Sequence, residues 1–293
     1  LDAWREAGVS RISLGCQSFQ DELLRALGRQ HSGAQAFEAA TRILEAGFAL
    51  SIDLIYGHAS QTMASWREDL LRAEVLVQDH GLRHVSGYFL TIEEGTPFYR
   101  RQRRGEVLVK QDDGESRGMV EALCEVLARG GVRPYEVSSY SAPGHESVHN
   151  SNYWLGGEYL GLGMGAHGLS VDREGRRGEV VRRQNTRRLK AYLTDPVGSG
   201  VEEVLTREDH LDERLFVAVR SRNGLDVAEI EAQFDLRDRE RQALDERLER
   251  LCEAGLLERV EGGKFVPTWE GMQVADMVGE ALLGVGSSGG VAV

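Results

Sequence analysis

A carboxylate lies inside one of the most apolar stretches of the chain. Asp53 interrupts the run at residues 50–56, and a buried carboxylate needs hydrogen-bonding partners. Two interpretations stay open: a structural Asp bonded to backbone amides or an arginine, or a ligand contact to the hydroxyls of a ribose. Gln17 follows an earlier apolar run at residues 11–15. Arg29 comes twelve residues after it, where it could reach a carboxylate.

A second group of candidates follows much later in the chain. His149, Asn150, Tyr153 and Trp154 lie within six residues of an expected loop and supply an imidazole, an amide and two aromatic rings. An imidazole can be an axial ligand of haem iron, and aromatic rings can stack on a macrocycle. The alternative is a histidine that is merely exposed or caps a helix.

Two further patterns are less specific. Residues 163–168 match the spacing G-x-G-x-x-G, but no helix is expected after them to bind a pyrophosphate. Tight backbone packing is therefore favoured over a dinucleotide site. Arginines cluster at residues 100–104 and 173–188. They are either solvated loop charge or anchors for carboxylates or phosphates.

The elements that must position these residues alternate between strand and helix. The apolar spacing predicts strands at residues 11–15, 50–56 and 84–92, with helices at 33–47 and 63–81 between them. This order indicates βαβ units and a parallel sheet, in a doubly wound fold or a (β/α) barrel. Ligands bind at the carboxyl ends of the strands in both folds. Further along we expect a helix at 111–130, a strand at 133–138, an irregular segment at 139–185, a short helix at 186–194 and a linker at 195–200.

The last third of the chain has a different pattern. Helices are expected near residues 206–220, 226–233, 237–254 and 269–283, with a small hairpin at 256–266. Helices followed by a hairpin are typical of a winged helix, an architecture that often binds DNA. The chain has a net charge of −12, however, and non-specific DNA affinity depends on neutralising phosphates. We therefore expect no nucleic-acid partner.

Composition narrows the remaining classes. The 293 residues are 41% hydrophobic and 28% charged, as in ordinary globular proteins, and no apolar run is long enough for a transmembrane helix. Three widely separated cysteines form neither a disulfide framework nor a metal-ligand set. Without a signal peptide, a cytoplasmic location is expected. The chain starts at Leu1 inside an expected helix, which suggests a fragment of a longer protein.

Three segments together resemble a known family. They are RISLGCQSF at residues 11–19, IDLIYG at 52–57, and PGHESVHNSNYW at 143–154 running into YLGLGMGAHG at 159–168. In this order they resemble the radical SAM family of oxygen-independent coproporphyrinogen III oxidase-like proteins. The HNxxYW block resembles its HemW branch, the haem chaperones.

The resemblance implies an α/β fold. It is a partial (β/α) TIM-like barrel of the radical SAM type that lacks its N-terminal half, followed by a helical winged-helix-like C-terminal domain. The expected domains are residues 1–195 for the partial barrel and its extension, residues 201–284 for the C-terminal domain, and residues 285–293 for a flexible tail.

The resemblance also implies a function. Gln17, Arg29 and Asp53 would bind S-adenosylmethionine, and His149, Asn150, Tyr153 and Trp154 would contact haem. The protein would then deliver haem as a chaperone. A coproporphyrinogen III oxidase of porphyrin biosynthesis is the alternative, so enzymatic activity stays open. Haem or a porphyrinogen is the expected partner, and a haem-accepting protein and peripheral membrane association are compatible with this interpretation.

The chain departs from the family in one important respect. The family's cluster motif, three cysteines at CxxxCxxC spacing, is absent. The 4Fe-4S cluster is therefore expected only in a full-length protein. No residue of this chain is assigned as a metal ligand or a catalytic residue, and the fragment alone is expected to be inactive.

Overall fold

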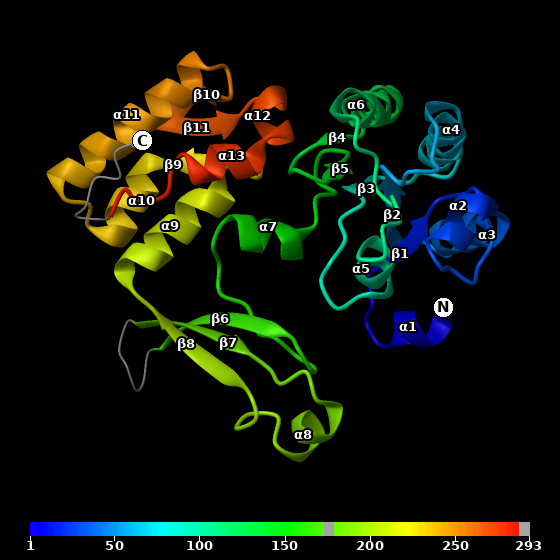
Figure 1. Ribbon diagram of the computed structural model, residues 1–293, viewed down its shortest axis with the longest axis horizontal. Helices are drawn as coiled ribbons and strands as arrows, with labels where there is room; N and C mark the ends of the chain where they lie inside the picture. The colour runs from blue at the N-terminus through cyan, green and yellow to red at the C-terminus, as the bar shows by residue number, and fades with distance from the viewer. Residues whose placement is uncertain (173–178, 287–293) are drawn as a thin grey trace. The chain divides into compact units, whose positions relative to one another are not determined.

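The computed structural model describes residues 1–172 and 179–286 (Figure 1). The chain divides into two compact units, residues 1–146 and 147–293. The sequence analysis places the boundary later, between residues 195 and 201. No helix among the described residues is both long and apolar enough to cross a membrane.

A parallel sheet forms the centre of the first unit. It contains β1 (Arg11–Gln17), β2 (Ala49–Tyr56) and β3 (His84–Phe89), in that order, with both neighbouring pairs parallel. The connections between them are α2 (Asp21–Ala26), α3 (Gly33–Glu45) and α4 (Met63–Asp79). These βαβ units confirm the predicted strands and helices of this part of the chain.

The sheet ends in two short antiparallel strands. β5 (Ser139–Ser141) pairs antiparallel with β3, and β4 (Arg133–Pro134) pairs antiparallel with β5. The single strand predicted at 133–138 is therefore two short strands that form a hairpin. Helix α6 (Asp113–Arg129) precedes this hairpin, α5 (Pro97–Gln102) follows β3, and α1 (Asp2–Glu6) precedes β1.

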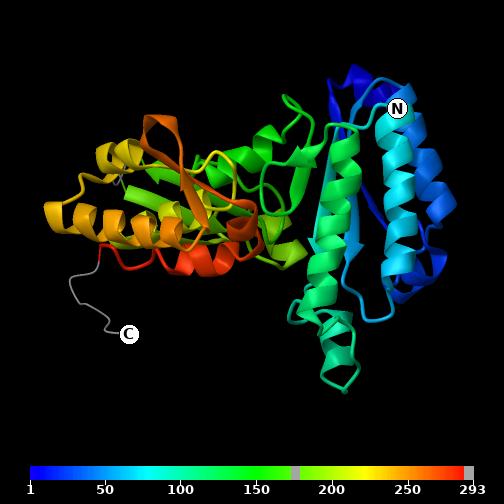
Figure 2. The same ribbon diagram turned by 90° about the horizontal axis from the view of Figure 1, so that it is seen from above.

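Alternation along β2 separates an apolar face from a polar one. Leu50, Ile52 and Leu54 are buried against the helices, together with Trp66 of α4. Figure 2 shows α3, α4 and α6 on this one face of the sheet. Because successive side chains of a strand point to opposite faces, Ser51 and Asp53 lie on the face that carries no helix of this unit.

The second unit begins with a helix and an antiparallel sheet. Helix α7 (Val148–Trp154) is followed by β6 (His167–Asp172), β7 (Glu179–Gln184), α8 (Leu189–Thr194) and β8 (Val201–Leu205), and the three strands pair in the order β6-β7-β8. The prediction of an irregular segment at 139–185 was wrong. The helix is short and the strands are rich in charge and glycine, so neither shows a clear apolar period.

The C-terminal part has the predicted helices and hairpin. Its helices are α9 (Arg207–Ala218), α10 (Val227–Phe234), α11 (Asp238–Glu253), α12 (Trp269–Gln273) and α13 (Ala275–Glu280). Strands β9 (Leu225–Asp226), β10 (Leu257–Arg259) and β11 (Lys264–Pro267) form a small antiparallel sheet, with a 3₁₀ turn at Glu261–Gly263. Leu211, Leu215, Leu244 and Leu248 are fully buried in the shared core. Most of the tail predicted at 285–293 lies outside the described residues.

Candidate functional site

Asp53 and Gln17 lie on the same open face of the sheet. The hydroxyl of Ser13 donates to the Asp53 carboxylate, with oxygen distances of 3.3 and 3.4 Å. The amide of Gln17 lies over Gly15, because a Cβ built at Gly15 would come within 3.0 Å of the Gln17 Nε2. Ser13, Gly15 and the Gln17 amide therefore share this face, opposite the helices. A carboxylate and an amide in this arrangement can bind hydroxyl and amine groups.

Opposing effects act on the pKa of the Asp53 carboxyl. Burial raises the pKa of the carboxyl, while hydrogen bonds from Ser13 and Ser86 and the charge of Arg11 lower it. The net direction is upward. Asp53 is therefore bonded to hydroxyls, and neither a backbone amide nor an arginine is its direct partner among the described residues.

Gln17 has an unusual backbone conformation. Its φ is +62°, and the pairing of β1 with β2 is irregular between Leu14 and Gln17. Non-glycine residues rarely occupy this left-handed region, and such strain is enriched at functional sites. The bulge is what turns the Gln17 side chain onto the open face.

Asp69 holds the end of β1 in place, and the sequence analysis missed it. This fully buried carboxylate of α4 accepts hydrogen bonds from the Ser18 hydroxyl and the Phe19 amide, both at 2.7 Å. Burial raises its pKa to about 6, against these hydrogen bonds. The available signal was an acidic residue on the otherwise apolar face of Trp66, Leu70 and Ala73. Asp69 thus fixes the loop that follows Gln17.

Arg29 lies in the loop that follows α2. It is exposed, and its side chain has no hydrogen bond to the described residues. Its expected contact with the carboxylate of a ligand therefore stays a prediction.

The second group of candidates lies on helix α7, whereas a loop was predicted. The Nε2 of His149 and the Tyr153 hydroxyl are 2.8 Å apart, and their rings meet edge to face at 4.8 Å. Tyr153 in turn meets the ring of Tyr159 at 4.5 Å. His149 is exposed, and its Nδ1 has no partner within the described part of the chain. The helix spacing i, i+4 therefore makes an oriented imidazole with one ring nitrogen available.

The other two residues of this group lie on the neighbouring strip of α7. Asn150 and Trp154 are partly buried, and the Trp154 indole N–H is buried without an acceptor in the described residues. The Trp154 carbonyl accepts from Arg214 of α9 at 3.5 Å. The indole nitrogen of Trp154 is therefore buried, whereas His149 is exposed and Tyr153 is half-buried.

The cysteines do not fit an iron–sulfur cluster. Cys16 is buried, with a pKa raised by burial to about 12, and burial likewise raises the pKa of Cys124 to about 11 and that of Cys252. Cluster ligation needs neighbouring thiolates. Across residues 1–172 and 179–286, no three His, Cys, Asp or Glu side chains are grouped so that they could hold a metal ion. The described residues therefore do not supply the ligands of an iron–sulfur cluster.

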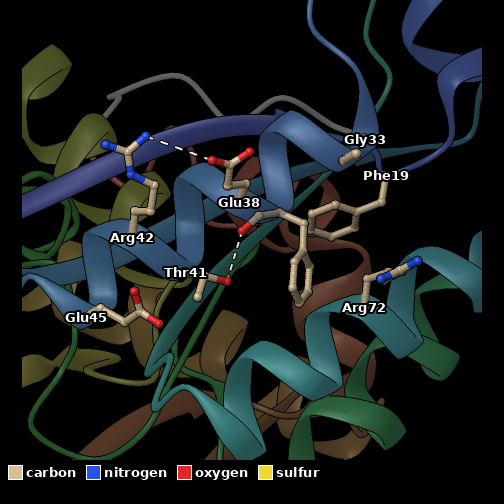
Figure 3. Close-up of a pocket in the computed structure, with 9 residues that line it drawn as sticks. Phe19, Gly33, Glu38, Thr41, Arg42, Glu45 and Arg72 are labelled. Atoms are coloured by element: carbon tan, nitrogen blue, oxygen red, sulfur yellow. Dashed lines mark hydrogen bonds and ion pairs between the residues drawn. The ribbon is translucent and has the colours of Figure 1, made fainter.

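A separate cavity of about 500 Å³ lies between α3 and α4 (Figure 3). The rings of Phe19 and Phe37 meet edge to face at 6.1 Å, and the Arg72 guanidinium lies 5.4 Å from the Phe37 ring. None of the candidate residues lines this cavity. It lies on the helical side of the sheet, away from Asp53.

Comparison with known proteins gives a consistent result. The Radical SAM superfamily model matches residues 1–73, and the HemN C-terminal domain model matches residues 205–274. The chain is 37% identical to the heme chaperone HemW of Mycobacterium tuberculosis (strain H37Rv) over 96% of its length and 67% of that protein. It is 35% identical to HemW of Lactococcus lactis over 78% of its length, but spans only 58% of that protein.

A solved structure shares the fold. The coproporphyrinogen III oxidase HemN of Escherichia coli, described as a radical SAM enzyme, superposes with a TM-score of 0.73 over 96% of this chain and 65% of that chain. At 22% identity this likeness shows the fold alone. Together the comparisons confirm the radical SAM fold and the resemblance carried by the sequence motifs.

Proposed function

Since the chain belongs to the HemW family of radical SAM proteins, we propose that it is part of a haem carrier and that His149 is the iron ligand. The arrangement on α7 supports this assignment. An iron-bound histidine usually donates its other ring N–H to a fixed acceptor, which orients the ring. With the Tyr153 hydroxyl accepting from Nε2–H, the lone pair of Nδ1 is available to the iron.

We further propose that Gln17 and Asp53 bind S-adenosylmethionine. Asp53 would accept hydrogen bonds from ribose hydroxyls, and the Gln17 amide would contact the same ligand across the open face. The shared sheet face and the fixed loop at Ser18 and Phe19 support this reading. When bound, the ligand supplies a sulfonium group. The described residues hold no cluster that could reduce it.

The oxidase alternative has less support. The relatives named above are heme chaperones, and the likeness to coproporphyrinogen III oxidase extends to the fold only. The arginine cluster at 173–188 that suits a substrate with several carboxylates lies partly outside the described residues.

The test is a haem titration of the whole chain followed by the Soret band. We expect saturable binding that His149→Ala abolishes or weakens at least ten-fold, and that Tyr153→Phe weakens about ten-fold because it removes the acceptor that orients the ring. His145→Ala, also exposed and four residues away, is the matched control and should bind as wild type. Equal binding by wild type and His149→Ala would rule out this ligand.

S-adenosylmethionine binding is tested separately by calorimetry. Asp53→Asn keeps the size of the side chain but removes its charge, and we expect it to bind the ligand about ten-fold more weakly, the effect of one charge-assisted hydrogen bond. Arg29→Gln tests the third candidate in the same way, because its charge is expected to pair with the carboxylate of the ligand. Unchanged affinity in Asp53→Asn would argue against the assignment.

A further inference from the structure

The carboxyl end of β2 contains a buried hydrogen-bond donor without an acceptor. His58 is only 5% exposed, and its Nε2 has no partner among the residues that the structure describes. Its Nδ1 lies 3.2 Å from the backbone N–H of Ser60 and 2.8 Å from the Ser60 hydroxyl. Because a backbone N–H can only donate, Nδ1 is the acceptor, and the proton of the neutral ring lies on Nε2.

The surrounding backbone is well paired, so the unsatisfied donor is not a sign of a loose loop. The Gln61 side chain accepts from the Gly57 N–H at 2.9 Å, and the Lys110 N–H donates to the Gly57 carbonyl at 2.8 Å. The Ala59 N–H donates to the Leu108 carbonyl at 2.9 Å. A buried donor left unpaired in so ordered a place calls for an explanation, such as a bound group.

A cation and an exposed aromatic ring lie at the same end of the sheet. Phe89 packs directly on Gly57, where an added Cβ would come within 2.4 Å of its ring, and Phe89 is 39% exposed. The Arg101 side chain is 40% exposed, stacks on Phe98 at 5.1 Å and donates through Nε to Glu106. Arg101 is bonded to Glu106, and the segment that follows pairs with the His58 loop through Leu108 and Val109, so this arginine of the 100–104 cluster belongs to the same loop cluster as His58. Burial and then the charge of Arg101 lower the pKa of His58.

We propose that His58 Nε2–H and Arg101 bind a carboxylate of a porphyrin whose planar body lies on Phe89. The neutral imidazole supplies one hydrogen bond, and the two Nη groups of Arg101, unbonded within the described residues, supply the charge. Arg101 is bonded through Nε alone to Glu106, so its two Nη groups can turn to the carboxylate. This inference deepens the proposed function, on which its choice of ligand rests, and uses only residues of the first unit.

The test compares metal-free mesoporphyrin IX with its dimethyl ester, by fluorescence titration of the whole chain. The ester keeps the ring but lacks the carboxylates, and the missing iron removes any ligation by His149. We expect wild type to prefer the acid about ten-fold, the value of one charge-assisted hydrogen bond. His58→Leu should lose this preference while its affinity for the ester stays the same.

Two further variants make the test specific. Arg104→Gln removes an exposed arginine of the same cluster and should keep the preference. His58→Gln retains an N–H donor and should restore part of it. His58→Leu also removes the acceptor of the Ser60 N–H, so its melting temperature is compared with that of wild type, and only a variant that is folded at the titration temperature is scored.

The outcomes separate this inference from the proposed function. If His58→Leu prefers the acid as strongly as wild type does, or wild type shows no preference, the carboxylate contact is wrong while haem binding through His149 stands. If wild type binds the acid with the expected preference but haem titration shows no dependence on His149, the carboxylate contact stands and the iron ligand is wrong. If wild type binds neither porphyrin, the carboxylate contact is wrong, and the haem titration alone decides whether His149 is the iron ligand.

Discussion

At the scale of single residues, the polar groups around the open sheet face are mostly held by hydroxyls and backbone rather than by opposite charges. Asp53 is bonded to Ser13, and His84 of β3 is bonded to Ser51 at 2.7 Å and to Tyr135 at 2.9 Å. Burial, and secondarily the charge of Arg11, lowers the pKa of His84 to about 3, so this ring is neutral at physiological pH. A neutral, satisfied histidine is structural, whereas His58 and His149 each retain a free ring nitrogen within the described residues.

Asp69 should make stability fall as the pH rises from 4 to 6. Its pKa of about 6 in the folded protein exceeds the ordinary value of 3.8, so over this interval the folded state binds a proton that the unfolded chain has released. The loss of free energy of unfolding is at most about 3 kcal/mol. Denaturant titrations at several pH values should show this slope, and Asp69→Asn should reduce it.

Asp79→Asn provides the control for that measurement. Asp79 is exposed at the end of the same helix, and its substitution should leave the slope as in wild type. A slope in Asp69→Asn equal to that of wild type would show that the titration belongs to other groups.

The reactivity of each cysteine thiol toward alkylating reagents should decrease as its burial increases. The pKa of Cys16 is raised to about 12, so almost no thiolate is present at pH 8, and the thiol is shielded from reagents. We expect iodoacetamide to leave Cys16 unmodified in the native chain and to modify all three cysteines in denaturant, as read by mass spectrometry. Native labelling of Cys16 at the rate seen in denaturant would contradict its placement.

At the scale of elements, side-chain hydrogen bonds in the first turn stabilise the start of helix α4, which packs on the sheet. Thr62 accepts from the Ser65 N–H at 3.1 Å, and the Ser65 hydroxyl accepts from the Thr62 N–H at 3.0 Å. Thr62→Ala leaves the Ser65 N–H without this acceptor and should lower the free energy of unfolding by about 1 kcal/mol.

The matched control is Thr41→Ala in the interior of α3. Thr41 bonds only the Phe37 carbonyl of its own helix, and Ala is the better helix former, so the change should be neutral or stabilising. If both variants lose the same stability, the effect comes from the threonine methyl group and not from the cap.

The sequence predicts elements well where the signals are local. Ser32 and Thr62 are followed three residues later by partners that complete their capping boxes, and both were expected as helix starts. β2 was predicted because Asp53 and Ser51 are the only polar residues in its apolar run at 50–56. Helix α7 was missed because it has only seven residues, too few to show a period of 3.6.

The candidate site was only partly predictable, because several of its features depend on tertiary contacts. Gln17 ends β1 and Asp53 lies inside β2, two strands whose parallel arrangement follows from the sequence. The role of Asp69 requires α4 to pack on β1, and the free Nε2 of His58 requires the Ser60 amide to face Nδ1. Residue types alone do not distinguish Asp69 and His58 from other buried polar side chains whose hydrogen bonds are all made.

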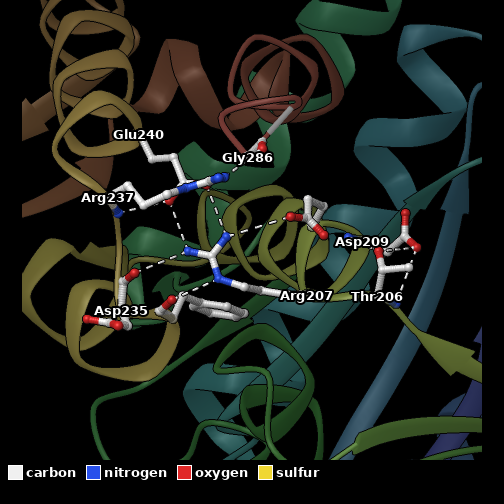
Figure 4. A network of polar contacts seen from close by, with 9 residues as sticks. Thr206, Arg207, Asp209, Asp235, Arg237, Glu240 and Gly286 are labelled. Carbon is white, nitrogen blue, oxygen red and sulfur yellow. Dashed lines mark hydrogen bonds and ion pairs between the residues drawn. The ribbon is translucent and has the colours of Figure 1, made fainter. Parts of the chain in front are cut away.

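At the scale of the whole molecule, one buried carboxylate joins several segments of the C-terminal part (Figure 4). Glu240 has a side chain only 4% exposed and accepts from Arg207 at 2.9 and 3.0 Å and from Arg237. Arg207 also donates to the Phe234 carbonyl, and Arg237 to that of Gly286. The cluster therefore ties the start of α9 to the end of α10, to the start of α11 and to the segment that follows α13.

This cluster should be lost in acid. The hydrogen bonds from Arg237 and Arg207 hold the pKa of Glu240 at about 2, below its ordinary 4.5, so its stabilisation is complete above pH 4.5 and disappears as the pH falls toward 2. Glu240→Gln should cost about 3 kcal/mol at pH 7 and remove this acid sensitivity. Glu246→Gln, exposed on the same helix, should change neither; a similar loss in both variants would refute the role of the cluster.

The edge position of β1 has a practical consequence. Within the described residues this strand pairs only with β2, so one side of its backbone carries unpaired N–H and C=O groups. Such an edge is a template for another strand. Concentrated preparations should therefore self-associate through residues 11–17. Hydrogen–deuterium exchange should show protection of β2 and β3 at every concentration, but of the outer amides of β1 only after association.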